Sequence, residues 1–198
     1  ICAAGFNGFR DAHQPHHLDY QKYWDEKGIL FWTQFSAHVW YDTPEFRENF
    51  KKLLRQWVKE RRNSPSVVIW GLQNESTLPR EFAQECSEII REMDPTARTM
   101  RVITTCNGGE GTDWNVIQNW SGTYGGDVTE YGKELSRKNQ LLNGEYGAWR
   151  SIGLHTEPGE FEVNGVWSED RMCRLMETKI RLAEQARDSV CGQFQWIY

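Results

Sequence analysis

The chain has 198 residues, which is enough for one large domain or two small ones with a sizeable core. Charged residues at 26% and hydrophobic residues at 38% are typical of a folded globular protein. The net charge of −5 offers no basic surface for nucleic acid or an anionic membrane, and no apolar run approaches the length of a transmembrane helix. We therefore expect neither a nucleic-acid nor a membrane partner.

The five cysteines are scattered and odd in number, and they match no disulfide framework or Cys-x-x-Cys metal site. Cys86 and Cys173 occur at core-like spacings in predicted helices, so both are expected to be buried free thiols. Ten tryptophans are many for this length. Tryptophan often stacks on sugar rings, although large barrel cores also use it.

The first half of the chain alternates between predicted strands and helices. Residues 1–4 form the predicted last turn of a helix that Gly5 ends. The patterns then predict a strand over 6–10, a helix over 18–27, a strand over 29–35, a helix over 44–62 and a strand over 67–70. The helix over 44–62 begins with a proline and has one apolar face, formed by Phe46, Phe50, Leu53, Leu54, Trp57 and Val58.

The second half continues the alternation. The patterns predict a helix over 79–93, strands over 101–106 and 115–119, a helix over 128–137 and a strand over 141–146. A long loop over 147–167 then precedes a helix over 168–188 and a last strand over 193–198. The inward side of that helix is predicted to consist of Met172, Leu175, Met176, Ile180 and Ala183.

Strand-then-helix alternation without a repeat or linker predicts a parallel α/β architecture. The prediction contains seven strands, and a closed (β/α)8 TIM barrel needs eight. Because the chain begins inside a helix and ends on a strand, we expect a TIM barrel lacking its first strand. Residues 1–198 would then be one catalytic domain, holding strands 2 to 8 of a larger multidomain chain. An open doubly wound sheet is the alternative, but no glycine-rich phosphate loop opens a helix.

Two carboxylates occur where predicted strands end. The unbroken apolar run 67–70 is typical of a strand buried on both faces, and Asn74 and Glu75 follow it. Glu145 ends the predicted strand 141–146. Active sites of parallel barrels are built at this end, so we expect the two glutamates to converge there. Such a pair suits glycosidic cleavage, with retention at a gap of about 5–5.5 Å and inversion at about 6.5–9.5 Å.

Four motifs in order resemble glycoside hydrolase family 2. The segment 6–15 resembles its Asn-x-x-Arg-x-x-His-x-Pro pattern, and 63–75 resembles its acid/base strand. The segment 145–148 resembles its nucleophile strand, and the following loop, with His155 and Pro158, is also family-like. The resemblance implies a retaining β-glycosidase on a (β/α)8 barrel, in the family of β-galactosidases, β-glucuronidases and β-mannosidases. It implies a carbohydrate substrate, no cofactor, and β-sandwich domains ahead of the barrel in a longer parent chain.

The resemblance also implies roles for single residues. Glu75 would be the acid/base and Glu145 the nucleophile, and Asn74 would bond the 2-hydroxyl of the sugar. A nearby Arg10 would lower the pKa of Glu145. The residues that would contact the sugar besides Arg10 and Asn74 are His13 and Trp196, with Trp196 alternatively a plain core residue.

Two departures from the family pattern stand out. The family usually has a tyrosine hydrogen-bonded to the nucleophile on the preceding strand. Here only Tyr124, on a loop, could serve. Ser36 and His38 stand where metal-dependent β-galactosidases place glutamate and histidine, and the segment 28–32 is closer to the β-mannosidase branch. We therefore expect no metal site.

Two other functions stay open at this point. Imidazole and carboxylate groups could form the site of a metal-dependent hydrolase of another class. Its ligands would come from His13, His16, His17, Asp11 and His38. Adjacent histidines rarely point the same way, which weighs against this cluster. The second alternative is a non-catalytic carbohydrate-binding barrel, which the aromatic content fits but which needs no pair of carboxylates at strand ends.

Overall fold

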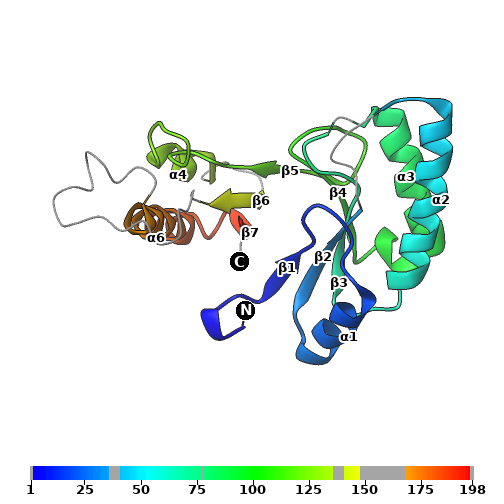
Figure 1. Cartoon of the computed structure of the whole chain (residues 1–198), viewed down its shortest axis with the longest axis horizontal. Coiled ribbons are helices and arrows are strands. Elements are labelled where there is room, and N and C mark those ends of the chain that lie inside the picture. Colours follow the sequence, from blue (N-terminus) through cyan, green and yellow to red (C-terminus); the bar gives the residue numbers. More distant parts are fainter. Residues whose placement is uncertain (1, 36–40, 77, 136–140, 148–167, 197–198) are drawn as a thin grey trace. The chain divides into compact units, whose positions relative to one another are not determined.

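The computed structural model describes residues 2–35, 41–76, 78–135, 141–147 and 168–196 (Figure 1). The strands of this part are β1 (Gly8–Arg10), β2 (Leu30–Gln34), β3 (Val67–Gly71), β4 (Val102–Cys106), β5 (Trp114–Gln118), β6 (Leu141–Gly147) and β7 (Val190–Trp196). Its helices are α1 (Leu18–Lys27), α2 (Pro44–Arg61), α3 (Arg80–Met93), α4 (Thr129–Leu135) and α6 (Glu169–Gln185), with 3-10 turns at Cys2–Ala4 and Pro95–Arg98. None of these helices is apolar over a stretch long enough to cross a bilayer.

The strands are hydrogen-bonded in the order β1-β2-β3-β4-β5-β6-β7, and every neighbouring pair is parallel. Parallel neighbours in chain order require a crossover between each pair, and the helices supply most of these crossovers. A doubly wound sheet reverses its strand order at a switch point, and this sheet does not. The predicted α/β class is confirmed.

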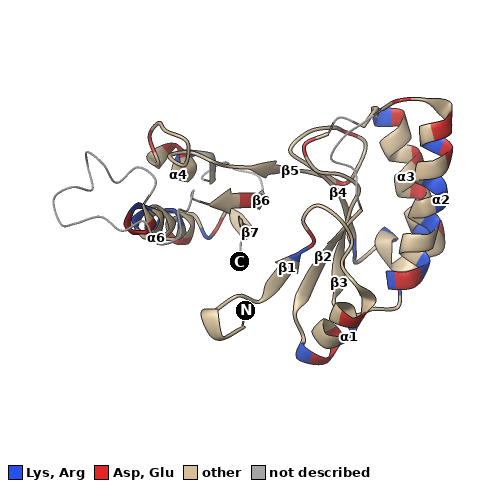
Figure 2. Ribbon diagram, viewed as in Figure 1, with Lys and Arg blue, Asp and Glu red and all other residues tan. Residues whose placement is uncertain are grey.

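The chain divides into two compact units, residues 1–116 and 117–198, and each is described by itself. In the first unit, α2 and α3 pack their apolar faces against the sheet. Trp57 of α2 meets Trp70 of β3 edge to face at 4.8 Å between ring centroids, and Phe50 packs against Phe35 at 4.8 Å. Figure 2 shows the charged residues concentrated on the helices, whereas β2 and β3 carry none.

Local signals set the helix ends as the sequence indicates. Gly28 ends α1 in the left-handed conformation at φ 68°, and its N–H donates to the carbonyl of Trp24. Thr43 caps α2, because its hydroxyl accepts the N–H of Phe46 at 3.2 Å. Pro44 occupies the first turn, where its missing N–H is not needed.

The start of β3 is anchored from α1. The Asp25 carboxylate accepts the N–H of Ser66 at 3.0 Å and the hydroxyl of Ser64. At the other side of the strand, the Trp70 indole N–H donates to the carboxylate of Asp94 at 2.9 Å. These bonds fix the position of β3, whose continuation carries Asn74 and Glu75.

In the second unit, α4 and α6 share a small core with β6. Its buried members are Tyr131, Leu135, Tyr146, Ala183 and Ala186. Ser168 caps α6 by accepting the N–H of Arg171 at 3.1 Å.

Three predicted core positions are wrong. Leu53 of α2 and Ile180 of α6 are exposed, because the buried stripe on each helix is narrower than the apolar pattern. Cys173 is also exposed, whereas Cys86 is buried as predicted, and burial raises the pKa of its thiol to about 12. Lys179 takes the inward position on α6 beside Leu175. All five cysteines are free thiols.

Candidate active site

The segment after β3 brings the first predicted carboxylate to the strand end. β3 ends at Gly71, yet residues beyond it still follow β4: the N–H of Leu72 donates to Thr104 and that of Glu75 to Cys106, both at 2.9 Å. Glu75 itself has φ 50°, the left-handed region that non-glycine residues rarely adopt. Strained backbone of this kind concentrates at functional sites. Glu75 is exposed and Asn74 is buried.

Arg10, the last residue of β1, holds Asn74 in place. Its Nη2 donates to Asn74 Oδ1 at 2.6 Å and to Gln34 Oε1 at 3.0 Å. The guanidinium lies over the Trp32 ring, 4.6 Å from its centroid. A cation over an indole with charge-assisted hydrogen bonds is held more firmly than a neutral donor would be.

A second set of amide groups fixes the backbone around Asn74 and Glu75. Gln34 donates through Nε2 to the carbonyl of Gln73 at 2.9 Å. Gln73 in turn donates to the carbonyl of Gly108 at 2.5 Å and accepts the N–H of Ser76 at 3.1 Å. The Gln34 side chain of β2 and the Gly108 backbone of the loop after β4 thus support this turn.

The loop that follows β1 is anchored by a buried acid. Asp11 is fully buried, and its carboxylate lies 2.5 Å from His16 Nδ1 and accepts the Thr33 hydroxyl at 3.3 Å. Burial raises the pKa of Asp11, while the hydrogen bond to Asp11 raises the pKa of His16. Arg61 donates to the His16 carbonyl at 3.0 Å. These contacts fix both ends of the loop that holds the half-buried His13.

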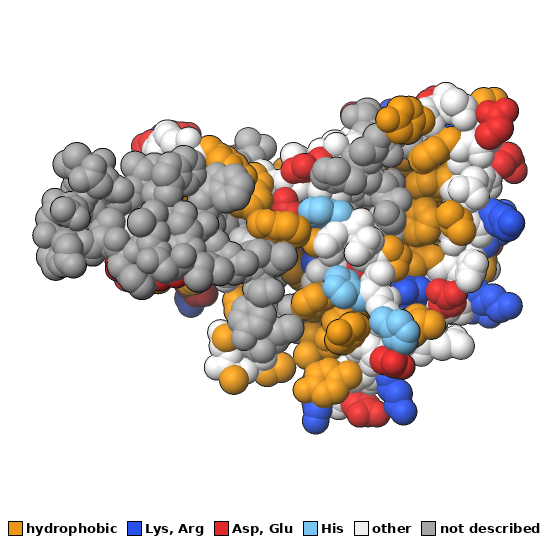
Figure 3. Space-filling model, viewed as in Figure 1, with side chains coloured by type: hydrophobic (Ala, Val, Ile, Leu, Met, Phe, Trp, Pro, Cys, Tyr) orange, Lys and Arg blue, Asp and Glu red, His pale blue; other side chains and the backbone are white. Residues whose placement is uncertain are grey.

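The three histidines in the described part of the chain do not gather into a metal site. His16 is paired with Asp11, and His17 caps α1 by accepting the N–H of Asp19 at 3.4 Å. Figure 3 shows the histidine side chains at separate places on the face in view. No three metal-ligating side chains gather anywhere in the described part of the chain. Ser36, His38, His155 and Pro158 lie outside the described residues.

The second predicted carboxylate lies within β6, two residues before the strand ends. Glu145 is 4% exposed, so its carboxylate is largely removed from bulk water. Its N–H donates to Asn143 Oδ1 at 3.3 Å, and its carbonyl accepts the N–H of Asn119 at 2.9 Å. The backbone of Glu145 is therefore held by its own strand and by the residue that follows β5.

The two predicted aromatic contacts lie in the second unit. Trp196 is the last residue of β7 and stands opposite Gly147, the last residue of β6. It is partly buried, as a residue at a strand end would be. Tyr124 is 61% exposed, and its ring lies 5.7 Å from that of Trp120. A role for either in sugar binding stays a prediction.

The structure brings the predicted residues together within each unit. Arg10, Asn74 and Glu75 form one group in the first unit. Glu145 and Trp196 occupy neighbouring strands in the second. The convergence of Glu75 with Glu145, and the approach of Arg10 to Glu145, stay predictions.

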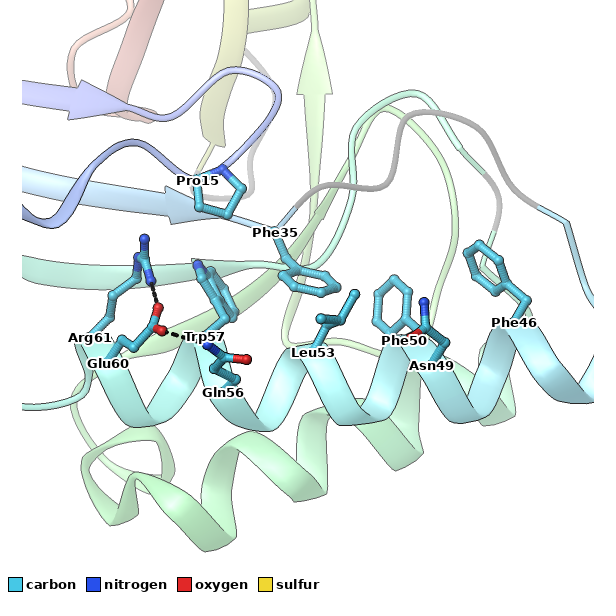
Figure 4. Close-up of a pocket in the computed structure, with 10 residues that line it drawn as sticks. All are labelled: Pro15, Phe35, Phe46, Asn49, Phe50, Leu53, Gln56, Trp57, Glu60 and Arg61. Atoms are coloured by element: carbon cyan, nitrogen blue, oxygen red, sulfur yellow. Dashed lines mark hydrogen bonds and ion pairs between the residues drawn. The ribbon is translucent and has the colours of Figure 1, made fainter.

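A cavity of about 450 Å³ lies against α2 (Figure 4). Aromatic rings form much of its wall, including those of Phe35, Phe50 and Trp57. It includes none of the predicted site residues, although Phe35 of its wall follows β2 directly. The placement of the chemistry at the strand ends stays a prediction.

Sequence reasoning missed several supporting residues. Gln34 was not singled out, and Asp11 was considered only as a metal ligand, although each is a polar residue at or just beyond the end of a strand. Lys179 was also missed, although it stands four residues after Leu175 and four before Ala183, both predicted to face inward. A charged residue at a core position is the signal that would have identified it.

Comparison with known proteins gives one family. Residues 1–164 match the family described as "Glycosyl hydrolases family 2, TIM barrel domain". The chain is 26% identical, over 98% of its length, to a "Putative beta-glucuronidase" of Formosa agariphila, and 27% identical, over 97%, to the "Beta-glucuronidase" of Bacteroides fragilis. It spans only 28% and 30% of the length of these two relatives.

Solved structures agree on the fold. The beta-glucuronidase of Parabacteroides merdae has a TM-score of 0.81 at 20% identity, and covers 97% of this chain and 29% of its own. Beta-glucuronidase 3 of Bacteroides uniformis has a TM-score of 0.81 at 21% identity, covering 97% and 28%.

Proposed function

Since the chain belongs to glycosyl hydrolase family 2, whose TIM barrel domain it matches, we propose that the intact protein is a retaining β-glycosidase. Membership confirms the resemblance seen in the four motifs and the expected TIM barrel class. The observation that carries the proposal is the placement of two glutamates at strand ends, Glu75 after β3 and Glu145 near the end of β6. A carbohydrate-binding protein has no need of either.

The proposed reaction has two steps. In the first, a Glu145 carboxylate oxygen bonds to the anomeric carbon while the glycosidic C–O bond breaks and Glu75 gives its proton to the leaving oxygen. In the second, Glu75 takes a proton from water, the water oxygen bonds to the anomeric carbon, and the bond to Glu145 breaks. Both carboxyl groups return to their starting states, and the configuration is retained.

Asn74 and Arg10 have binding roles in this proposal. The Asn74 amide would bond the 2-hydroxyl of the sugar, an interaction that strengthens in the oxocarbenium-like transition state. The bond from Arg10 to Asn74 Oδ1 supports this role, because it fixes which way the amide faces. His13 and Trp196 would contact the sugar, and Tyr124 would reach it from its loop.

For the substrate we propose a β-linked glucuronide. The two relatives named above match 97–98% of this chain, and both are called glucuronidases, as are the two similar structures. A galactosidase relative, in contrast, matches only 50% of the chain. These relatives are longer than this chain. We propose that the intact protein also has β-sandwich domains ahead of the barrel.

The test uses the intact protein with aryl β-glucuronide, β-galactoside and β-mannoside. We expect release of phenol from the glucuronide, and loss of turnover in both Glu75→Gln and Glu145→Gln. A matched control is Glu81→Gln, which alters an exposed glutamate on α3. Activity on none of the three glycosides, or full activity of Glu145→Gln, would refute the proposal.

A further inference from the structure

A fully buried lysine lies against the end of the strand that carries Glu145. Lys179 of α6 is 0% exposed, and its Nζ donates to the hydroxyl of Thr123 and to the carbonyl of Gly147, both at 2.8 Å. Gly147 is two residues after Glu145. A buried ammonium group is destabilising unless it is hydrogen-bonded, so these two bonds are what hold it there.

The lysine closes a small network at the end of β6. The Thr123 hydroxyl also donates to the Gly147 carbonyl, at 2.6 Å. Arg171 of α6 donates to the carbonyl of Gly122 and, at 3.4 Å, to that of Thr123. Lys179 thus joins the segment after β5 to the end of β6, and Arg171 ties the first of these to the same helix.

Gly147 approaches the backbone of β7 closely. A Cβ at this position would lie 2.3 Å from the backbone oxygen of Trp196, so only glycine fits beside β7. The close approach of the two strands therefore depends on the Gly147 backbone, which Lys179 holds.

The same cluster reaches the other side of Glu145. Asn143, two residues before it, accepts the Glu145 N–H and donates to the Tyr131 hydroxyl at 3.0 Å. The Tyr131 ring lies 5.5 Å from the ammonium of Lys179. The strand is therefore held two residues before and two residues after Glu145, and Tyr131 touches both supports.

We infer that Lys179 is a positioning residue that fixes the backbone of β6 and thereby aims the carboxylate of Glu145; this rests on the proposed role of Glu145 as nucleophile. An apolar side chain would fill the same space without a buried charge. Burial, with Arg171 nearby, lowers the pKa of Lys179 to about 8, which is the sign of that penalty. The hydrogen bond from Lys179 to the strand that carries Glu145 explains why a charged residue occupies this costly buried position.

The experiment measures how fast Glu145 becomes glycosylated in the intact protein. A dinitrophenyl 2-deoxy-2-fluoro-β-glycoside of the sugar that the wild type hydrolyses reacts with the nucleophile, and the slow second step leaves it covalently labelled. Intact mass gives the labelled fraction with time, and peptide mass gives the labelled residue. The rate constant of labelling measures how well the Glu145 carboxylate is positioned, whereas the final labelled fraction measures how much of the protein is folded.

For Lys179→Met we expect a full labelled fraction and a rate constant lower by about tenfold to a hundredfold, the usual effect of a misplaced reacting group. Lys179→Arg, which keeps the donors and the charge, should recover part of the rate. The matched control is Arg181→Met, which removes an exposed cation from the same helix and should react like the wild type.

Other outcomes separate the inference from the function it rests on. Wild-type rate in Lys179→Met, or an unchanged rate with a smaller labelled fraction, would overturn the inference and leave the proposed function intact. Label on a residue other than Glu145 in the wild type would overturn both. If Lys179→Met does not fold, Thr123→Val is used instead, because it removes the hydroxyl that accepts a hydrogen bond from Lys179. Slower labelling of Glu145 in Thr123→Val would support the inference, and labelling at the wild-type rate would overturn it.

Discussion

One nitrogen of Arg10 joins β1 to β2 and to the segment after β3: Nη2 donates to Asn74, 64 positions away, and to Gln34, 24 positions away. β1, β2 and the segment after β3 are thus fixed relative to one another at the point where Glu75 emerges. The planar guanidinium over Trp32 suits this geometry, and a lysine ammonium would not reproduce it.

Arg10→Lys should therefore lower kcat/KM for an aryl glycoside by about tenfold to a hundredfold, because Asn74 and the turn after it lose their fixed geometry. The measurement is steady-state kinetics on the intact protein. Arg47→Lys is the matched control, since Arg47 pairs with exposed carboxylates of Asp42 and Glu81. Equal effects of the two changes would contradict a specific role for Arg10.

Asn74→Ala should lower kcat/KM most for a substrate whose sugar has a 2-hydroxyl. Loss of an amide whose bond to this group strengthens in the transition state should lower kcat/KM by about a hundredfold, and by much less for the matching 2-deoxy glycoside. Kinetics with the two substrates measure the difference. Equal losses on both would show that Asn74 acts through the fold.

Gly71→Ala should destabilise the first unit. The added Cβ would lie 2.5 Å from Trp32 Nε1 in a fully buried site, and overpacking of this kind costs about 1–3 kcal/mol. Urea unfolding followed by tryptophan fluorescence measures the loss. Trp32→Phe removes the clashing atom, so the double variant should regain part of the stability, and no change in Gly71→Ala would contradict the packing described.

His16 should titrate above its ordinary pKa of 6.5, because Asp11 stabilises its charged form. The folded pKa is raised, so the pair's contribution to stability is fully present below pH 6.5 and is lost as pH rises through the folded pKa. It also requires ionised Asp11, whose pKa burial raises, so it fades again in acid. An NMR titration of the His16 ring in wild type and Asp11→Asn tests this; an unchanged midpoint in the variant would refute it.

Much of the fold follows from local patterns. The run from Val67 to Trp70 consists of apolar residues that favour strands, and β3 covers this run and extends one residue beyond it, to Gly71. Helix α1 has the predicted bounds because Gly28 ends it by a local conformation. β7 begins three residues earlier than predicted, at Val190, because pairing with β6 and not local propensity extends it.

The site could be predicted only in part. Glu75 and Glu145 were found because strand ends can be recognised in sequence. The bond of Arg10 to Asn74 depends on register between strands, which no local pattern encodes. Lys179 looks like a solvent-facing residue unless its spacing from Leu175 and Ala183 is weighed above its charge.

The central claim is that Glu145 attacks the sugar while Glu75 serves first as acid and then as base. Glu75→Ala of the intact protein should still react with an aryl glycoside of an acidic phenol, giving a burst, and then stall for want of a base. Added azide needs no base, so it should restore turnover.

The anomeric configuration of the azide product is the most direct measurement, and NMR coupling constants give it. The account predicts a β-glycosyl azide from Glu75→Ala and an α-glycosyl azide from Glu145→Ala, because azide replaces water in the first and the nucleophile in the second. An α-azide from Glu75→Ala would contradict the account, since it would make Glu75 the nucleophile.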